Sequence, residues 1–185
     1  MMFTSLVLGL VIGQSSGFLP SEAPSTRDIF LQTPKGTRTP MSALEARLHL
    51  ELAYLATFGI QPSDQTLSRM MAQWALETAR GAQMWGYNFG GLKAGKGGVF
   101  LQTRESYGTS ERQVTEPFRT YRSAAEGARD YVKTLSATFP KSFSSLHHGT
   151  VQEFVEALAN ENYFTGDRKR YQRAITLLSG EFSRE

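Results

Sequence analysis

Residues 70–94, MMAQWALETARGAQMWGYNFGGLKA, join a helical pattern to a glycine-rich segment. From Ser63 to Thr78, apolar side chains recur at the i, i+3, i+4 and i+7 spacing of a core-facing helix, and Gly81 is the predicted end. Seven glycines follow between residues 81 and 98, which predicts a loop with tight bends or close backbone approaches. A single carboxylate, Glu77, lies near the end of this helix, so the helix and loop are the stretch around which we expect the fold to be organised.

The composition bounds the class of protein. The chain has 185 residues, of which 40% are hydrophobic and 20% charged, as in one soluble globular domain. Its net charge of +3 is mild, and its basic residues are interspersed with acids, so the sequence argues against a nucleic-acid partner. There is no cysteine, which excludes disulfides, thiolate metal sites and a cysteine nucleophile. No segment is apolar for long enough to predict a membrane span.

The first 40 residues differ from the rest. Residues 3–12, FTSLVLGLVI, resemble the core of a short signal peptide, but no Lys or Arg precedes Arg27 and no clear small-residue cleavage site follows. The alternative is an apolar arm that packs on the domain or is disordered. Four prolines between residues 13 and 40 predict an irregular linker, so we expect the folded domain to span residues 41–185.

The remaining pattern predicts a mostly helical α+β fold. A helix is expected from a Ser42 cap to Gly59, with an apolar stripe of Leu44, Leu48, Leu52 and Leu55. Alternation over residues 99–107 and 112–118 predicts one β-hairpin. Three closing helices are expected after caps at Ser123, Thr150 and Asp167, with Pro140 as a stop. This is the layout of a lysozyme-like domain with one small hairpin lobe.

Glu77 has the surroundings of a general acid. Partial burial beside Trp74 and Met70 would raise the pKa of this carboxyl, and the negative end of the helix dipole would raise it further. A carboxyl that keeps its proton near neutral pH can protonate a leaving group. The alternative is a boundary glutamate that is solvated or paired with Arg80.

Six short segments occur in a fixed order between residues 72 and 171: AQWALETARG (72–81), NFGGLKA (88–94), TRESY (103–107), FRTYRS (118–123), DY (130–131) and YFTGDRKRY (163–171). Together they resemble the bacterial glucosaminidase family of peptidoglycan hydrolases, glycoside hydrolase family seventy-three. Ala79-Arg80 departs from the Gly-Trp that the family usually has there. Gly166 precedes Asp167 in the last segment, and the proline usual after that acid is missing.

The resemblance implies hydrolysis of the β-1,4 bond between N-acetylglucosamine and N-acetylmuramic acid, by an endo-β-N-acetylglucosaminidase. Glu77 matches the family's catalytic acid. Glu105 matches a second carboxylate on the hairpin, which would activate water or stabilise positive charge on the sugar ring. A path assisted by the substrate's acetamido group stays open, as does the reading of Glu105 as a surface charge opposite Arg112.

Five residues are candidates for sugar contacts through ring stacking or hydrogen bonds: Tyr163, Tyr121, Asn88, Trp85 and Tyr87. Tyr163 matches an active-site tyrosine of the family. Trp85 and Tyr87 are alternatively anchors of the loop, and Asn88 alternatively holds the loop against the domain.

The expected partners follow from the resemblance: peptidoglycan strands, with a dedicated inhibitor protein as a further candidate. No cofactor and no metal are implied, since the pair His147-His148 lacks a carboxylate cluster. A monomer that acts on the bacterial cell wall, in the periplasm or outside the cell, is expected. Two rivals remain: a muramidase or lytic transglycosylase of lysozyme fold, and an inactive glycan-binding module, which the altered Ala79-Arg80 segment favours.

Overall fold

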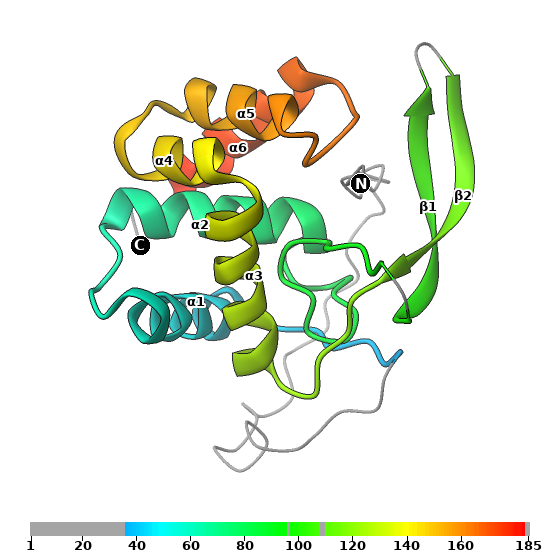
Figure 1. The fold of residues 1–185 in the computed structure, drawn as a ribbon, viewed down its shortest axis with the longest axis horizontal. Helices are drawn as coiled ribbons and strands as arrows, with labels where there is room; N and C mark the ends of the chain where they lie inside the picture. Colours follow the sequence, from blue (N-terminus) through cyan, green and yellow to red (C-terminus); the bar gives the residue numbers. More distant parts are fainter. Residues whose placement is uncertain (1–35, 96, 108–109, 184–185) are drawn as a thin grey trace, which may run out of the picture.

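A computed structural model describes residues 36–95, 97–107 and 110–183, with the side chains of residues 104–112 left out. Within these ranges the chain forms six helices and one two-stranded antiparallel sheet (Figure 1). The predicted arm at residues 3–12 and most of the predicted linker lie outside the described residues. In order, the elements are α1 (Ala43–Phe58), α2 (Asp64–Thr78), β1 (Val99–Tyr107), β2 (Ser110–Phe118), α3 (Ala124–Thr138), α4 (Pro140–His148), α5 (Val151–Asn160) and α6 (Arg168–Phe182).

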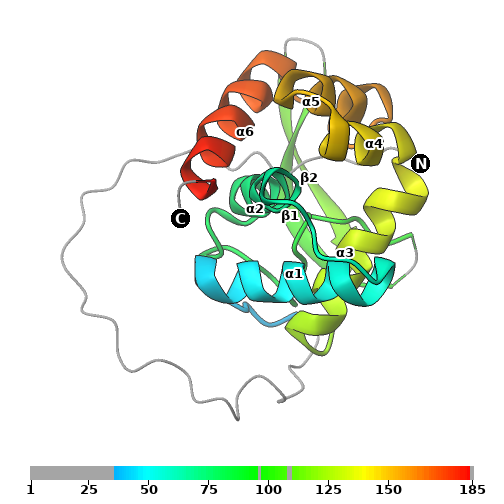
Figure 2. The ribbon, with the colours of Figure 1, turned by 90° about the vertical axis from the view of Figure 1, so that its left-hand side faces the viewer.

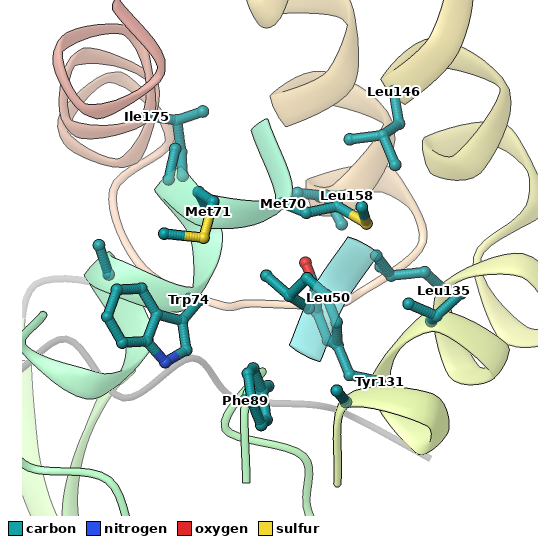
Figure 3. Close-up of a cluster of buried hydrophobic side chains, with 14 of the residues drawn as sticks. Leu50, Met70, Met71, Trp74, Phe89, Tyr131, Leu135, Leu146, Leu158 and Ile175 are labelled. Carbon is teal, nitrogen blue, oxygen red and sulfur yellow. The ribbon is translucent and has the colours of Figure 1, made fainter. Parts of the chain in front are cut away.

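Helix α2 is the centre of the molecule. Figure 2 shows it end-on with the other helices around it, and it contacts α1, α4 and α6. Twelve of its fifteen residues are buried, so only a small part of its surface meets water. The core around it is shown in Figure 3, where the labelled side chains of α2 meet those of the surrounding elements: Leu50, Met70, Met71, Trp74, Phe89, Tyr131, Leu135, Leu146, Leu158 and Ile175.

Helix α1 buries a different face from the predicted leucine stripe. Leu44, Leu48 and Leu52 are 79%, 48% and 51% exposed. The buried face lies two residues further along and consists of Ala46, Leu50, Ala53 and Tyr54. Two stripes of α1 are apolar, and the one with two alanines packs on α2 and α3, because short side chains allow helices to approach closely.

The region after Pro140 forms a fourth closing helix, whereas the sequence predicted three, with Pro140 only as a stop. Proline lacks an N–H, and at the first turn of a helix that N–H has no intrahelical partner, so Pro140 begins α4 as well as following α3. His147 then joins the packing of α4 on α1: its Nε2 lies 2.5 Å from the Tyr54 hydroxyl and its Nδ1 lies 2.6 Å from the Phe143 carbonyl oxygen. Among the described residues, no group of three His, Asp or Glu side chains could hold a metal ion.

The helix caps follow the predicted residues. Thr150 and Glu153 form a reciprocal capping box at α5. At α3, Ser123 accepts a hydrogen bond from the Glu126 N–H, but the Glu126 carboxylate accepts from the Arg122 N–H. The predicted cap at Ser123 is therefore present, but it does not form the reciprocal box seen at α5.

The hairpin projects away from the helices (Figure 1). Val99 pairs with Phe118 and Tyr107 with Ser110, so the second strand begins two residues earlier than predicted. Phe100 is 68% exposed, whereas Thr103 is buried, which gives the ribbon one outer and one inner face. No described helix combines the length and the hydropathy needed to cross a membrane.

Candidate active site

Glu77 lies at the end of α2, at the wall of a hollow between the helical body and the root of the hairpin. Its side chain is only 4% exposed. The lining of the hollow comes from the end of α2, the following loop and both strands: Glu77, Thr78, Gln83, Met84, Trp85, Asn88, Gly91, Leu101 and Phe118. Glu77 is the one acidic or basic residue in this lining.

Three buried tyrosines surround Glu77 on the body side. The Tyr171 hydroxyl donates a hydrogen bond of 3.0 Å to Glu77 Oε1. Burial raises the pKa of Tyr131, Tyr163 and Tyr171 well above the usual value, and the negative charge of Glu77 raises each of them further. These phenols therefore stay protonated at neutral pH, and that of Tyr171 serves as a donor to the carboxylate.

The glycine-rich loop passes close to Glu77. A side chain at Gly91 would place its Cβ 3.0 Å from Glu77 Oε2. A Cβ at Gly90 would lie 2.6 Å from a ring atom of Tyr131 and 2.8 Å from the Tyr163 hydroxyl. The predicted close approach is thus found at these two positions, where the absence of a side chain lets the loop reach the carboxylate.

Tyr163 and Asn88 hold this loop. Tyr163 is 2% exposed, and its hydroxyl donates a 2.6 Å hydrogen bond to the Gly90 carbonyl oxygen. Asn88 donates to the carbonyl oxygens of Leu92 and Arg119, at 2.9 and 3.0 Å, and accepts from the Leu92 N–H at 2.8 Å. Both side chains thus hold the loop, which for Asn88 was one of the two roles considered from the sequence. Asn88 also lines the hollow.

The short segment before α1 supports the other end of the loop. The Arg38 guanidinium lies 5.1 Å from the ring centre of Trp85, a cation–π distance. The Tyr87 N–H donates to the Thr39 hydroxyl at 2.8 Å. Trp85 also lines the hollow. Both aromatic residues are held by backbone and ring contacts that leave part of each side chain exposed.

Tyr121 belongs to a polar cluster beside the loop. Its hydroxyl donates a 2.5 Å hydrogen bond to Asp130 Oδ2, and Arg119 Nη1 donates to the same oxygen at 2.7 Å. Burial, and then the neighbouring Asp130 carboxylate, raise the pKa of Tyr121. The FRTYRS and DY segments therefore meet through Asp130, a contact that the sequence analysis did not predict.

The exit of α2 is tightly bent. The helix ends at Thr78, three residues before Gly81, and both Ala79 and Arg80 have left-handed backbones, with φ of 50° and 57°. Arg80 forms two hydrogen bonds with the Glu181 carboxylate, at 2.6 and 2.8 Å. The residues that replace the usual Gly-Trp thus link α2 to α6.

The Glu105 side chain lies outside the described residues. Its backbone belongs to β1 and pairs with that of Arg112, as expected from the sequence. Leu101 and Phe118 at the root of the hairpin line the hollow with Glu77, so the strand that carries Glu105 begins at the site.

Two residues near Glu77 were absent from the predicted site. Tyr171 donates to Glu77, and Gln73 lies one helical turn before Glu77 and donates to the Tyr171 hydroxyl at 3.4 Å. The i, i+4 spacing of Gln73 and Glu77 would have indicated that they share a helix face.

The fold of this chain is shared by several solved structures. The chain aligns with a crystal structure of a peptidoglycan hydrolase mutant from Sphingomonas sp. A1 at 22% identity and a TM-score of 0.54, covering 77% of this chain and 93% of that one. The C-terminally truncated glycoside hydrolase domain of Salmonella typhimurium FlgJ aligns at 24% identity and a TM-score of 0.50, covering 78% of this chain and 99% of that one. The catalytic domain of the Listeria monocytogenes autolysin Auto aligns at 20% identity and a TM-score of 0.52, covering 79% of this chain and 87% of that one.

These structures confirm the predicted lysozyme-like α+β fold. No curated protein sequence matches the chain. The family model of the glucosaminidases, described as mannosyl-glycoprotein endo-β-N-acetylglucosaminidase, matches residues 61–181, which is more than half of the chain. The chain therefore belongs to the glucosaminidase family and is a glycoside hydrolase.

Proposed function

We propose that this protein hydrolyses β-1,4 bonds in the glycan strands of bacterial peptidoglycan, as an endo-β-N-acetylglucosaminidase with Glu77 as the general acid. The observation that carries the proposal is the carboxylate of Glu77, 4% exposed at the wall of a hollow and held by the Tyr171 hydroxyl. The peptidoglycan hydrolases that share the fold support the choice of substrate.

In this mechanism Glu77 donates its proton to the glycosidic oxygen as the bond to the anomeric carbon breaks. An apolar wall around a carboxyl favours its neutral form, which is the form an acid catalyst needs at the start of the reaction. Leu101, Phe118 and Met84 supply apolar surface of this kind in the hollow. Once the proton has left, the hydrogen bond from Tyr171 stabilises the remaining carboxylate.

Glu105 is proposed as the second carboxylate. Because side chains alternate along a strand, position 105 belongs to the same face of β1 as Leu101 and Thr103, and Leu101 lines the hollow. Glu105 would activate water or stabilise the positively charged sugar ring. A carboxyl separation of about 5 Å gives retention and one of roughly 6.5–9.5 Å gives inversion. A path through the acetamido group needs Glu77 alone.

Trp85, Asn88 and Tyr87 are proposed to contact the sugars, because Trp85 and Asn88 line the hollow and Tyr87 follows Trp85 in the same loop. Tyr163 and Tyr121 use their hydroxyls within the protein, so any contact that these two residues make with the sugars is proposed to use the ring. The protein would work as a monomer on the cell wall, in the periplasm or outside the cell, and a dedicated inhibitor would bind over the hollow.

The test is the Glu77→Gln variant on purified sacculi, with products identified by mass. We expect about a 10³-fold loss of turnover with glycan binding retained, since amide and carboxyl have nearly the same shape. Glu156→Gln, an exposed glutamate on α5, is the matched control and should keep full activity. New reducing ends on N-acetylglucosamine are the expected product.

Other products would select the rivals. Anhydro-muramoyl ends would identify a lytic transglycosylase, and new reducing ends on N-acetylmuramic acid a muramidase. Binding of sacculi without turnover by the unmodified protein would instead establish a glycan-binding module.

A further inference from the structure

A chain of three hydrogen bonds runs through the core and ends on Glu77. The Tyr131 hydroxyl donates to Gln73 Oε1 at 2.6 Å, Gln73 Nε2 donates to the Tyr171 hydroxyl at 3.4 Å, and Tyr171 donates to Glu77 Oε1 at 3.0 Å. All four side chains are buried: Tyr131 and Gln73 are 0% exposed, Tyr171 is 3% and Glu77 is 4%. Buried polar groups are costly unless they are hydrogen-bonded, so this arrangement constrains each of its members.

The number of protons on each side chain allows the three hydrogen bonds to run in only one direction. A tyrosine hydroxyl has a single proton, whereas a glutamine amide accepts through its oxygen and donates through its nitrogen. Because Tyr131 gives its proton to the amide oxygen of Gln73, the amide nitrogen faces Tyr171. The Tyr171 oxygen then accepts from Gln73, and its own proton is directed to Glu77 Oε1.

We propose that Gln73 and Tyr131 are positioning residues that fix Tyr171 as a donor to Glu77 Oε1 and thereby place the transferable proton on Oε2. This inference rests on the proposed role of Glu77 as general acid. Oε2 is the oxygen next to Gly91, 3.0 Å from the position of a Cβ there, and Gly91 lines the hollow. The proton is thus held on the oxygen beside a residue that lines the hollow, and Oε1 faces the core.

Among the side chains that the structure describes, titratable groups near Glu77 come from three elements: Tyr131 from α3, Tyr163 from the turn between α5 and α6, and Tyr171 from α6. The pKa of each phenol is raised by burial and by Glu77, so all three keep their protons at neutral pH. From the hairpin, Leu101 and Phe118 contribute uncharged side chains to the same hollow. The protonation of Glu77 is therefore the observable that reports on these hydrogen bonds.

The experiment follows the ¹³C signal of the Glu77 carboxyl during a pH titration, with the signal assigned by its loss in Glu77→Gln. In Gln73→Met, the Tyr171 hydroxyl can turn to accept a proton from neutral Glu77, which favours the neutral form. We expect the midpoint to rise by about half a pH unit, the equivalent of part of one hydrogen bond. Tyr131→Phe should act in the same direction, since the Gln73 amide can then turn its oxygen towards Tyr171.

Tyr171→Phe removes the donor itself and should raise the midpoint at least as much. Adding Gln73→Met to Tyr171→Phe should give no further rise, because Gln73 acts through the Tyr171 hydroxyl. Tyr54→Phe is the matched control: it removes another buried tyrosine hydroxyl, the one that contacts His147, and should leave the Glu77 midpoint unchanged.

An unchanged or lowered midpoint in Gln73→Met would overturn the proposal, as would a rise that persists in the Tyr171→Phe background. If Gln73→Met does not fold, Tyr131→Phe carries the test alone, with the same two outcomes. The titration needs no turnover, so it is independent of the proposed activity. Full activity of Glu77→Gln would refute the general acid and leave the hydrogen-bond result standing.

Discussion

The two carboxylates of the proposed site are held in opposite ways. Glu77 lies at the end of the most buried helix, with a hydrogen bond from α6 and the loop backbone close by. Glu105 belongs to a two-stranded ribbon that projects from the body and has few contacts with the helices (Figure 1). An isolated two-stranded ribbon is marginally stable in water. The acid is therefore fixed, whereas the second carboxylate is carried by the element that most easily changes position.

One short segment connects these two regions. Residues 88–94 reach Glu77 through Gly91 and pair with the root of the hairpin, where the Ala94 N–H donates to the Pro117 carbonyl oxygen at 2.8 Å and the Arg119 N–H to that of Leu92 at 2.9 Å. The Asn88 amide stabilises this connection by donating to the carbonyl oxygens of both Leu92 and Arg119. The root of the hairpin is therefore fixed to the loop that reaches Glu77, whereas position 105 lies near the outer end of β1, two residues before Tyr107.

Among the tests of this contrast, Glu105→Gln has the largest expected effect on turnover. If the hairpin delivers the second catalytic carboxylate, turnover of sacculi should fall by about 100-fold, while the melting temperature stays unchanged because the ribbon contributes little to the core. Glu116→Gln, on the other strand of the same ribbon, is the control and should lower turnover less than twofold. Unchanged activity in Glu105→Gln would favour the path through the substrate's acetamido group.

The next test moves the fixed carboxylate. Gly91→Ala would place a Cβ 3.0 Å from Glu77 Oε2 at a backbone φ of +59°, and the displaced carboxylate should reduce turnover by roughly 10- to 100-fold. Gly97→Ala is the matched control: its φ is +75°, but its Cβ would meet no atom within 4 Å. Both variants should lose about 1 kcal/mol of stability from the left-handed backbone, and only the first should lose activity. Equal losses of activity would show that loop strain, and not contact with Glu77, is responsible.

Local patterns were sufficient to predict most of the fold. The cap at Ser42, the end at Gly59 and the pairing of the hairpin depend on neighbouring residues, and the structure has all three. The errors arose where two local interpretations compete. Pro140 both follows one helix and begins the next, and α1 has two apolar stripes of which only tertiary packing selects one.

The site shows the same limit more sharply. Glu77 could be found from its place on the helix, but its partner Tyr171 is 94 residues away in the sequence, and no periodicity links them. The hydrogen bond between Tyr131 and Gln73 spans 58 residues, so no local pattern predicts it either. Tyr163 was expected at the sugar, yet its hydroxyl binds the Gly90 backbone, a contact that depends on how the loop folds back. Its sugar contact and that of Tyr121 stay predictions.

The smallest predicted effect concerns the exit of α2, where the family usually has glycine. Ala79 has φ of 50° and ψ of 55°, and its N–H still donates to the Ala75 carbonyl oxygen. A left-handed alanine costs about 1–2 kcal/mol of stability, which glycine would not cost. Glycine also makes the unfolded chain more flexible, and this cancels part of the gain. Ala79→Gly should therefore raise stability by about 0.5–1 kcal/mol, measured as a rise of roughly 2 °C in melting temperature.

Ala82→Gly, three residues on and outside the left-handed region, supplies the control and should lower the melting temperature instead. A fall in Ala79→Gly as well would mean that the bidentate Arg80–Glu181 contact depends on alanine at the cap. A rise with turnover unchanged would show that the strained backbone at Ala79 is a cost to stability that catalysis does not need, because the helix that carries Glu77 would have been stabilised at no loss of rate.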